Sequence, residues 1–338
     1  MKAKRVVVNQ TIDLGRDAGL TAFGKARDDV NRTCHDCGME IETIGCRLYK
    51  VPFLSNLMGV WKNLRMILRH PCGTEYVVQY PVSCKKSFPL VIRLQHLFGN
   101  RVTILIHDIQ SVRYHRDPRA DVAVFRLTDR IIAHTPAMKA WIEQQGVVTP
   151  VVYTQLFDYY TDDHFRPIED LKRRKQEIVY AGNLTKSEFL EPLQKTDFGP
   201  LMFHLYGKSD GKDFTSKNVR YCGIFQSNHT STVEGGWGLV WDGPSIDTCT
   251  GDLGDYLHLI ASHKLSLYLT IGIPVIVWKE SAEAEFVVSN GLGIAVASLK
   301  ELPERIASIS DEEYSQMLDR CREQGKILRR GGRLKAIL

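Results

Sequence analysis

The sequence predicts an α/β protein with two Rossmann-like, doubly wound domains that face a central cleft. The chain has 338 residues, about twice the usual size of a domain. Short β-branched runs alternate with longer amphipathic segments, a pattern typical of parallel sheets with crossover helices. The alternation stops at a polar, charged stretch around Pro167 and then starts again. We therefore expect an N-terminal domain over residues 1–158, a linker over 159–176 and a C-terminal domain over 177–338, whose last helix could pack back on the first domain.

Each half carries six expected strands. In the first half these are residues 5–9, 40–44, 76–79, 102–106, 130–134 and 151–154. In the second half they are residues 177–181, 202–206, 219–223, 238–241, 274–278 and 294–296. Apolar residues three and four apart predict helices at 54–70, 88–98, 136–145, 255–271, 282–289 and 311–328. Ligands of doubly wound sheets bind at the carboxyl ends of the strands, so we expect the functional residues there.

Composition excludes several classes of protein. The first residues lead directly into the apolar run that starts at Val6, which predicts a first strand rather than a signal peptide. The longest apolar run is interrupted by Gly272 and Pro274 and falls far short of the roughly 20 residues that span a bilayer. We expect a soluble, cytoplasmic protein, with peripheral contact to the inner face of the cell membrane left open.

The cysteines and basic runs give weaker signals. Among the eight cysteines, Cys34 and Cys37 form the one close pair, and no second pair has the spacing of a structural zinc site. A structural role is therefore expected for both. The basic runs at 172–175 and 329–335 either contact phosphates or an anionic leaflet or simply lie in solvent. No basic segment is interleaved with stacking aromatic residues, so we expect no nucleic-acid partner.

The most informative block runs from Gly235 to Val277 and contains a helix that begins near His263. The free N–H groups of its first turn carry a partial positive charge, and Lys264 adds a full one. This combination suits a diphosphate, although Lys264 could also be an ordinary surface lysine. A second block, Gly182-Asn183 followed by Lys186, comes directly after a strand. It could approach a phosphate, or it could be a common turn.

Two further blocks lie in the first half. The loop that contains Gly15, Arg16 and Asp17 lacks the glycine spacing of a dinucleotide site, so NAD binding is not supported. A glycine loop that opens a helix can still face a sugar ligand. His107-Asp108 follows a predicted strand, where it could anchor a loop or supply a general base.

These blocks resemble the bacterial β-1,6-galactofuranosyltransferases of O-antigen synthesis. The matching segments are RDAG at 16–19, IHDI at 106–109, VYAGNL at 179–184, GLVWDG at 238–243, TCTG at 248–251, GDYL at 254–257, HKLSLYL at 263–269 and NGLG at 290–293. The resemblance touches both halves of the chain. More distantly, the sequence is similar to the streptococcal glucosyltransferases that extend glycans on serine-rich adhesins, which share the lysine-containing helix, the Gly-x-Pro-Val-Ile turn and the Gly-Asn turn.

The resemblance implies a GT-B fold and a UDP-sugar donor, UDP-galactofuranose or another UDP-hexose. It also implies a β-linked product, formed by inversion, on a glycan acceptor that is lipid-linked in lipopolysaccharide synthesis. It leaves a homo-oligomer open. By the same resemblance, UDP or the donor sugar would be bound by Gly15, Arg16, Gly182, Asn183, Lys186, Tyr206, Gly207, Asp242, Asp255, Tyr256, His263, Lys264 and Tyr268.

Two absences refine the expected mechanism. The chain has no Asp-x-Asp pair, which anchors a metal ion on the diphosphate in the other major glycosyltransferase fold. We therefore expect no metal, with the diphosphate charge met by lysines and helix N-termini. Many retaining GT-B enzymes carry a glutamate where this chain has Leu267, which favours inversion. Asp108, with His107 beside it, is the preferred catalytic base, and Asp13 and Asp17 are the alternatives.

Two other functions stay open. One is a UDP-glucose-dependent glucosyltransferase that extends a protein-bound glycan. The other is a protein that binds a nucleotide sugar without turnover. A dehydrogenase-type epimerase is disfavoured, because it would need the glycine fingerprint of an NAD site and a Tyr-x-x-x-Lys pair.

Overall fold

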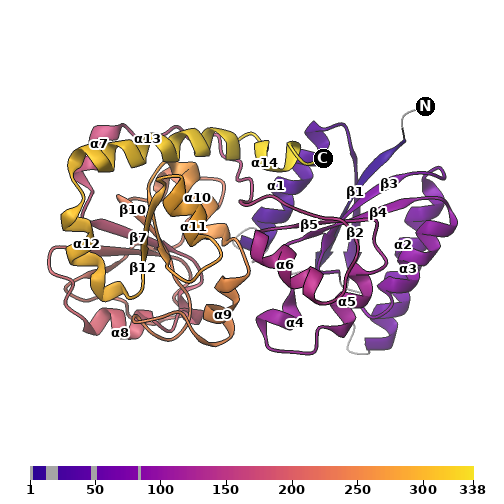
Figure 1. The fold of residues 1–338 in the computed structure, drawn as a ribbon, viewed down its shortest axis with the longest axis horizontal. Coiled ribbons are helices and arrows are strands. Elements are labelled where there is room, and N and C mark those ends of the chain that lie inside the picture. The colour runs from indigo at the N-terminus through magenta and orange to yellow at the C-terminus, as the bar shows by residue number, and fades with distance from the viewer. Residues whose placement is uncertain (1–2, 13–21, 47–51, 83–84) are drawn as a thin grey trace. The chain divides into compact units, whose positions relative to one another are not determined.

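The computed structural model describes residues 3–12, 22–46, 52–82 and 85–338. Its contacts divide the chain into two compact units. The first comprises Met1–Thr154 together with Leu334–Leu338, and the second comprises Gln155–Arg333. Each unit contains a six-stranded sheet in which all neighbouring strands are parallel (Figure 1). The prediction of two doubly wound α/β units is confirmed.

The first unit has the strand order β2-β1-β3-β4-β5-β6. Its elements are β1 (Arg5–Ile12), α1 (Ala22–Asp36), β2 (Glu40–Cys46), α2 (Pro52–Arg69), β3 (Glu75–Tyr80), α3 (Phe88–Leu97), β4 (Arg101–Ile106), α4 (Gln110–Arg113), α5 (Arg119–Phe125), β5 (Arg130–Ala133), α6 (Pro136–Gln144) and β6 (Val151–Tyr153). The central strands are apolar runs because a parallel sheet is covered on both faces.

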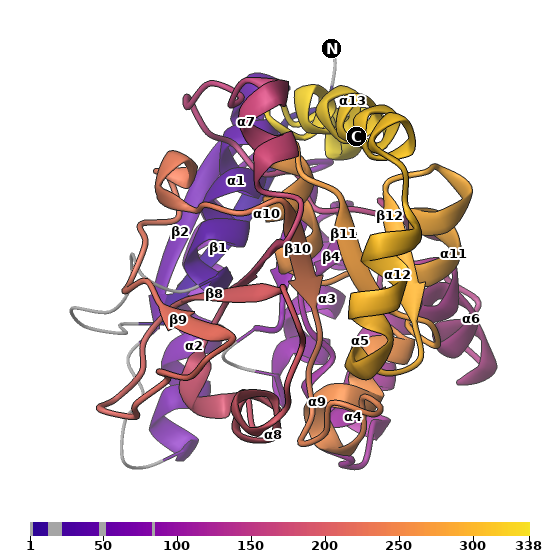
Figure 2. The ribbon, with the colours of Figure 1, turned by 90° about the vertical axis from the view of Figure 1, so that its left-hand side faces the viewer.

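The second unit has the strand order β12-β11-β10-β7-β8-β9. Its elements are α7 (Ile168–Arg173), β7 (Glu177–Ala181), η2 (Leu184–Lys186), α8 (Leu190–Lys195), β8 (Met202–Tyr206), β9 (Val219–Tyr221), η3 (Thr230–Thr232), β10 (Trp237–Val240), α9 (Gly251–Asp255), η4 (Tyr256–His258), α10 (His263–Ile271), β11 (Val275–Trp278), α11 (Ala284–Ser289), β12 (Gly293–Val296), η5 (Leu299–Glu301), α12 (Leu302–Ser308) and α13 (Asp311–Leu328). Helix α11 packs on β11 and β12 (Figure 2). The core is aromatic-rich, with Trp237, Trp241 and Tyr268 fully buried.

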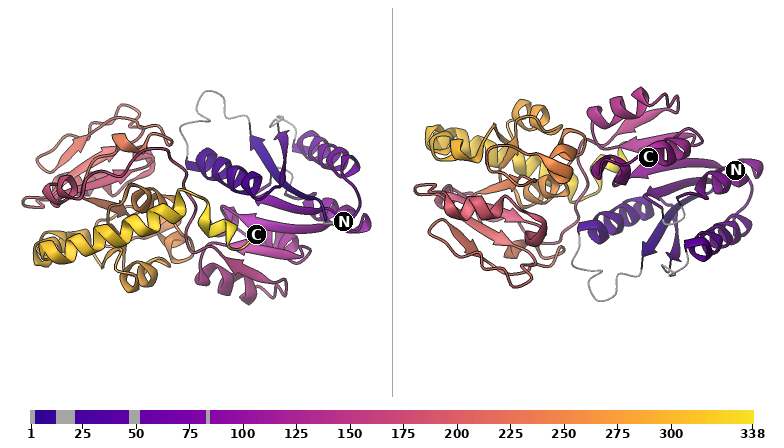
Figure 3. Two further views of the ribbon diagram at one scale, coloured as in Figure 1. Left: turned by 90° about the horizontal axis from the view of Figure 1, so that it is seen from above. Right: turned by 90° about the horizontal axis from the view of Figure 1, so that it is seen from below.

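The last residues of the chain complete the first unit. Helix α14 (Gly332–Lys335) brings Leu334 into a buried cluster with Val7, Val30 and Cys34. Arg5 donates a hydrogen bond of 2.9 Å to the carbonyl oxygen of Leu338. Figure 3 shows the C-terminus beside the strands of this unit. The chain therefore returns, after the whole second unit, to cover one face of the first sheet.

The segment at 159–176 differs from the expected linker. Tyr159 and Leu171 are almost completely buried in the core of the second unit, and helix α7 lies within the segment. Because the boundary between the units falls after Thr154, this segment is part of the second unit rather than a connection between two units. The many charged residues of this segment made it look like a linker, although Tyr159 and Leu171 are core residues.

The expected helix over 255–271 is interrupted. Helix α9 ends at Asp255, a 3-10 turn follows, and α10 starts only at His263. The side chain of Ser262 accepts a hydrogen bond from the backbone N–H of Lys264 and so caps the new helix. The break matters because it creates a helix N-terminus in the middle of the predicted block.

The two basic runs are engaged in local pairs. Their partners include Glu169 for Lys172, Glu177 for Arg174 and Asp311 for Lys175. In the second run, Arg329 donates to the carbonyl oxygen of Thr270, and Lys335 pairs with Asp36. The structure thus gives these basic side chains intramolecular partners, which neither of the two expectations included. Within the described ranges, no helix is long and apolar enough to cross a membrane.

Candidate functional site

The strand order of the second sheet reverses between β7 and β10. From β7 the chain moves outward through β8 to β9, whereas β10 lies on the other side of β7 and continues to β11 and β12. Such a reversal leaves a crevice at the carboxyl ends of the two central strands. Gly182 follows β7 directly, and Asp242 follows β10. Two of the predicted binding segments therefore meet at this switch point.

Lys264 is held at this point by two neighbours. Its Nζ atom lies 2.9 Å from Oδ2 of Asp242, and 5.1 Å above the ring of Tyr180. Burial by itself would lower the pKa of Lys264, but the Asp242 carboxylate and the Tyr180 ring raise it above its ordinary value. The lysine is therefore a permanent cation in the first turn of α10, fixed in direction. An ammonium group has three N–H donors, so the bond to Asp242 leaves capacity for a further acceptor.

A chain of hydrogen bonds joins Lys264 to the Gly-Asn turn. The hydroxyl of Tyr180 lies 2.6 Å from Oγ of Ser187 and 3.4 Å from Oδ1 of Asp242. Ser187 in turn donates to the carbonyl oxygen of Asn183 at 2.9 Å. The segment 183–187 and the pair of Lys264 and Asp242 thus form one connected polar group, although they lie far apart in the sequence.

The Gly-Asn turn itself has a packing explanation. The N–H of Gly182 donates to the carbonyl oxygen of Tyr206 at 2.9 Å, and a Cβ on Gly207 would lie 1.8 Å from the carbonyl oxygen of Gly182. The ends of β7 and β8 therefore approach so closely that only glycine fits at Gly207, where φ is +148°. Asn183 caps the following 3-10 turn through Thr185, and Lys186 at its end is exposed.

Two tyrosines that were predicted to bind the donor make hydrogen bonds within the second unit. The hydroxyl of Tyr268 accepts a hydrogen bond of 2.9 Å from the N–H of Ala181, which ties α10 to the end of β7. Gly238 makes room for the Tyr268 ring, because a Cβ there would lie 2.0 Å from the ring. The hydroxyl of Tyr206 accepts from the N–H of Glu234 at 3.1 Å. Both rings are buried.

The remaining predicted residues of this unit lie in the β10–α10 connection and at its end. Asp255 is half-buried at the last position of α9, and Tyr256 is buried in the next turn. This connection folds back on the site, because a Cβ on Gly254 would lie 3.2 Å from the carbonyl oxygen of Asp242. The ring of His263 packs against Tyr159, with 5.0 Å between ring centroids.

Sequence reasoning missed one buried acid at the site. Oε1 of Glu283 accepts a hydrogen bond of 2.5 Å from the N–H of Ser262, the residue that caps α10. Burial raises the pKa of Glu283 to about 8, against the favourable effects of that hydrogen bond and of Lys264. The sequence offered no means of choosing it, because Glu280 and Glu285 flank it and both are exposed. Glu283 is thus a neutral carboxylic acid at neutral pH, behind the first turn of α10.

This pKa predicts a pH-dependent stability. Between about pH 4.5 and 8 the folded protein holds a proton that the unfolded chain has lost, so the free energy of unfolding should fall as pH rises through that range. Glu283→Gln keeps the acceptor for Ser262 and removes the ionisation. Urea unfolding should show equal stability of both proteins at pH 5 and a variant that is more stable by roughly 2–4 kcal/mol at pH 9. Glu280→Gln, at an exposed neighbour, should leave the pH dependence unchanged, and equal slopes for all three proteins would contradict the assignment.

In the first unit, the structure surrounds Asp108 with cationic groups. Arg113 donates to Oδ2 of Asp108 at 3.0 Å, and Arg27 is close enough for the carboxylate to stabilise its charge. Burial lowers the pKa of Arg27 to about 10, which Asp108 partly offsets. His107 is buried, and its Nε2 lies 2.8 Å from Oε1 of Gln79. The sequence pattern did not indicate a role for Arg27, because this residue lies within α1 and does not follow a strand in the sequence.

The loop candidates of the first unit fall outside the described residues. This applies to Asp13, Gly15, Arg16 and Asp17. They follow β1, which stands between β2 and β3 at the point where the strand order of the first sheet reverses. Their predicted roles therefore remain predictions.

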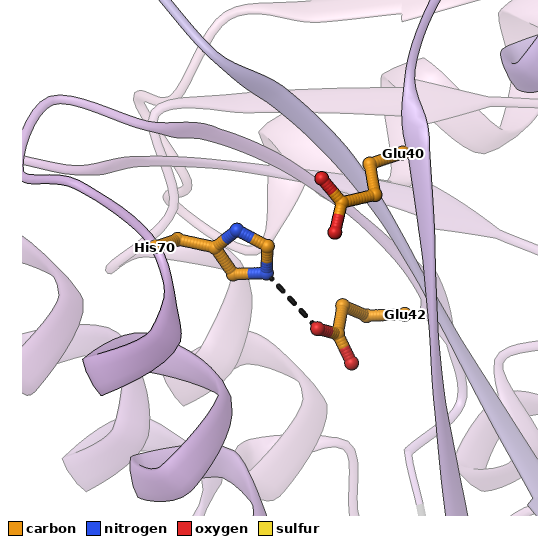
Figure 4. Close-up of side chains that lie close together, drawn as sticks. All are labelled: Glu40, Glu42 and His70. Carbon is orange, nitrogen blue, oxygen red and sulfur yellow. Dashed lines mark hydrogen bonds and ion pairs between the residues drawn. The ribbon is translucent and has the colours of Figure 1, made fainter.

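One group in the described part of the chain could hold a metal ion by its composition. Glu40, Glu42 and His70 point toward one another, with their ligand atoms within 4.8 Å (Figure 4). Glu42 accepts from His70 at 3.1 Å, while Lys4 lies 2.6 Å from Glu40 and lowers the pKa of that carboxyl group. Arg69 lies 3.5 Å from Glu42. Because each carboxylate already faces a basic side chain, the group works as an ion-pair cluster between β2 and the end of α2.

Comparison with known proteins covers nearly the whole chain. Residues 6–156 match the family described as the Glucosyltransferase 3-like N-terminal domain, and residues 178–338 match the corresponding C-terminal domain. Beta-1,6-galactofuranosyltransferase WbbI of Escherichia coli (strain K12) is 31% identical over 281 residues, which cover 79% of this chain and 80% of that protein. Glucosyltransferase 3 of Streptococcus gordonii is 37% identical over 275 residues, covering 79% and 78%.

Solved structures support the fold at lower identity. Sucrose-phosphate synthase from Thermosynechococcus elongatus superposes with a TM-score of 0.67 at 13% identity, covering 96% of this chain and 94% of that one. The α,α-trehalose 6-phosphate synthase from Burkholderia multivorans gives a TM-score of 0.59 at 10% identity, covering 100% and 95%. The expected GT-B fold and the resemblance to galactofuranosyltransferases are both confirmed.

Proposed function

The chain belongs to the Glucosyltransferase 3-like family of glycosyltransferases, and we propose that it transfers galactofuranose from UDP-galactofuranose to a glycan acceptor, with inversion and without a metal ion. The product would be a β-linkage, formed at O6 of the acceptor sugar in surface-polysaccharide synthesis. The acceptor would be lipid-linked.

One observation carries the donor part of the proposal. Lys264 is a fixed cation in the first turn of α10, at the switch point of the second sheet, with Asp242 and Tyr180 determining its direction. A diphosphate at this helix N-terminus would meet a full positive charge together with free backbone N–H groups. Lys186, exposed on the connected turn, would add a second charge.

The chemical demand on the enzyme is then small. Inversion needs a base that takes the proton from the acceptor hydroxyl and a positive environment for the departing UDP. We assign the second task to Lys264, Lys186 and the N-terminus of α10, so that no divalent ion is required. The first task we assign to Asp108, with Asp13 and Asp17 as alternatives.

The choice of galactofuranose rests on the similarity to a galactofuranosyltransferase over most of both chains. A second candidate is a glucosyltransferase that uses UDP-glucose to extend a protein-bound glycan. It is favoured by the 37% identity to Glucosyltransferase 3 of Streptococcus gordonii. The two candidates share the UDP site and differ only in the sugar and the acceptor.

A donor comparison tests the proposal. The purified protein is incubated with UDP-galactofuranose, UDP-galactopyranose or UDP-glucose and with octyl β-glucoside as a surrogate acceptor, and both UDP release and the glycosylated product are measured. We expect the fastest transfer from UDP-galactofuranose, and equal rates in EDTA and in Mg²⁺. UDP-galactopyranose is the matched control, because it differs only in the ring form of the sugar.

The other outcomes distinguish the alternatives. Faster transfer from UDP-glucose would identify a glucosyltransferase, and loss of activity in EDTA would refute metal independence. UDP binding without product formation or donor hydrolysis under any condition would favour a protein that binds the nucleotide sugar without turnover.

A further inference from the structure

The outer face of α2 carries large apolar side chains where a surface helix normally carries polar ones. Leu57, Trp61 and Leu68 are 55%, 51% and 65% exposed, while Asn63 on the opposite face is buried and donates to the carbonyl oxygen of Gly59. Spacings of four and seven residues place the three exposed side chains on one stripe of the helix. Single exposed apolar residues are ordinary, but several large ones on the same side of a helix indicate an interaction surface.

Helix α3 repeats the pattern beside it. Leu90 is 51% exposed and Leu97 is 81% exposed. Arg93, which is also exposed, follows Leu90 by three residues and precedes Leu97 by four. Helices α2 and α3 contact each other and lie side by side in the first unit (Figure 1). We call the exposed sides of these two neighbouring helices the α2–α3 face, which is made of Leu57, Trp61, Arg65, Leu68, Leu90, Arg93 and Leu97.

The charge on the α2–α3 face is of one sign. Arg65 lies between Trp61 and Leu68 on the stripe, with its guanidinium group 5.7 Å from the centre of the Trp61 ring. Neither helix contains an acidic residue. Residues 52–97 contain six lysines and arginines and a single acidic residue, Glu75, so this segment alone carries a net charge of +5, equal to that of the whole chain.

We propose that the α2–α3 face binds an anionic lipid surface. Apolar and tryptophan side chains that alternate with arginines match the boundary between acyl chains and negatively charged headgroups. A second copy of the chain fits less well. In a symmetric dimer the same face meets itself, and Arg65 and Arg93 would then meet only cations and apolar groups. The proposal does not depend on which sugar the enzyme transfers.

Vesicle sedimentation tests the proposal with the full chain. The wild type should pellet with vesicles of phosphatidylglycerol and phosphatidylcholine, but not with phosphatidylcholine alone, and it should be released by about 0.5 M NaCl. The triple variant Leu57→Ser, Trp61→Ser, Leu68→Ser should bind the vesicles at least about 10-fold more weakly than the wild type. The variant Arg65→Glu, Arg93→Glu should bind these vesicles at least about 25-fold more weakly, since the loss of each cation near such a surface weakens binding about 5-fold and each glutamate adds repulsion.

Matched controls separate the face from general effects. Lys195→Glu with Lys217→Glu changes the net charge equally at two lysines with 72% and 71% exposed side chains, and Val148→Ser removes an apolar side chain that is 93% exposed. Both should bind vesicles like the wild type, and UDP affinity should be unchanged in every variant as a measure of folding. Failure of the wild type to bind, or equal binding by the α2–α3 variants, would overturn the proposal. So would a wild-type dimer in sedimentation that Trp61→Ser converts to a monomer, because the face would then be an interface between copies.

Discussion

Lys264→Met is expected to weaken UDP binding about 10- to 100-fold and to reduce transfer at least as much. A charge-assisted hydrogen bond contributes roughly 1.5–3 kcal/mol, and methionine keeps most of the apolar stem of the lysine while removing the ammonium group. The structure fixes that group at the N-terminus of α10 over Tyr180, so no other side chain of the turn can easily replace it. Isothermal titration with UDP measures the affinity directly, without a choice of acceptor.

The structure also exposes a complication of this experiment. Removing Lys264 leaves the part-buried carboxylate of Asp242 without its cation, which could destabilise the fold by itself. Adding Asp242→Asn to Lys264→Met should restore stability against urea but not UDP affinity. Lys186→Ala, at an exposed lysine of the connected turn, should weaken UDP binding by a smaller factor. If the double variant binds UDP like the wild type, Lys264 acts only through its ion pair and is no ligand of the diphosphate.

The sequence predicted the fold well because parallel strands leave an unambiguous local signal. Runs such as 102–106 and 275–277 are apolar on both faces, and the turns between them are marked by glycine and proline. The candidate site could be predicted to the extent that its residues follow strand ends. Asp242 and Lys264 were both predicted to bind the donor. Their ion pair could not be predicted from the sequence, because it depends on how the 21 intervening residues fold back.

The sequence-based predictions failed where the role of a residue depends on whether it is buried, which the local sequence pattern does not reveal. The stretch at 159–176 is polar enough to suggest a linker, yet Tyr159 and Leu171 are core residues. In α2 the sequence predicts a helix but not its orientation, because Asn63 faces inward and Trp61 outward, against the usual preference of both. Glu283 illustrates the same point, since three glutamates lie within six residues and only packing selects the buried one.

Asp108→Asn is expected to reduce the rate of transfer by a factor of about 100 to 10,000, the usual contribution of a general base. UDP affinity should stay close to that of the wild type, since Asp108 belongs to the first unit and the proposed diphosphate ligands to the second. Asparagine preserves the size of the side chain and can still accept a hydrogen bond from Arg113. Single-turnover measurements at saturating UDP-galactofuranose isolate the chemical step from binding.

The ion pair with Arg113 supplies the decisive control for Asp108. The Arg113 guanidinium lies 3.0 Å from the Asp108 carboxylate and belongs to α4, so the carboxylate could matter only by holding that helix in place. Arg113→Gln breaks the same contact from the other side and leaves the carboxylate intact. If Asp108 is the base, Arg113→Gln retains much of the transfer rate while Asp108→Asn loses it. Equal losses in both variants would make the ion pair a structural element and move the role of the base to Asp13 or Asp17, because a contact that only positions a helix depends equally on both of its partners.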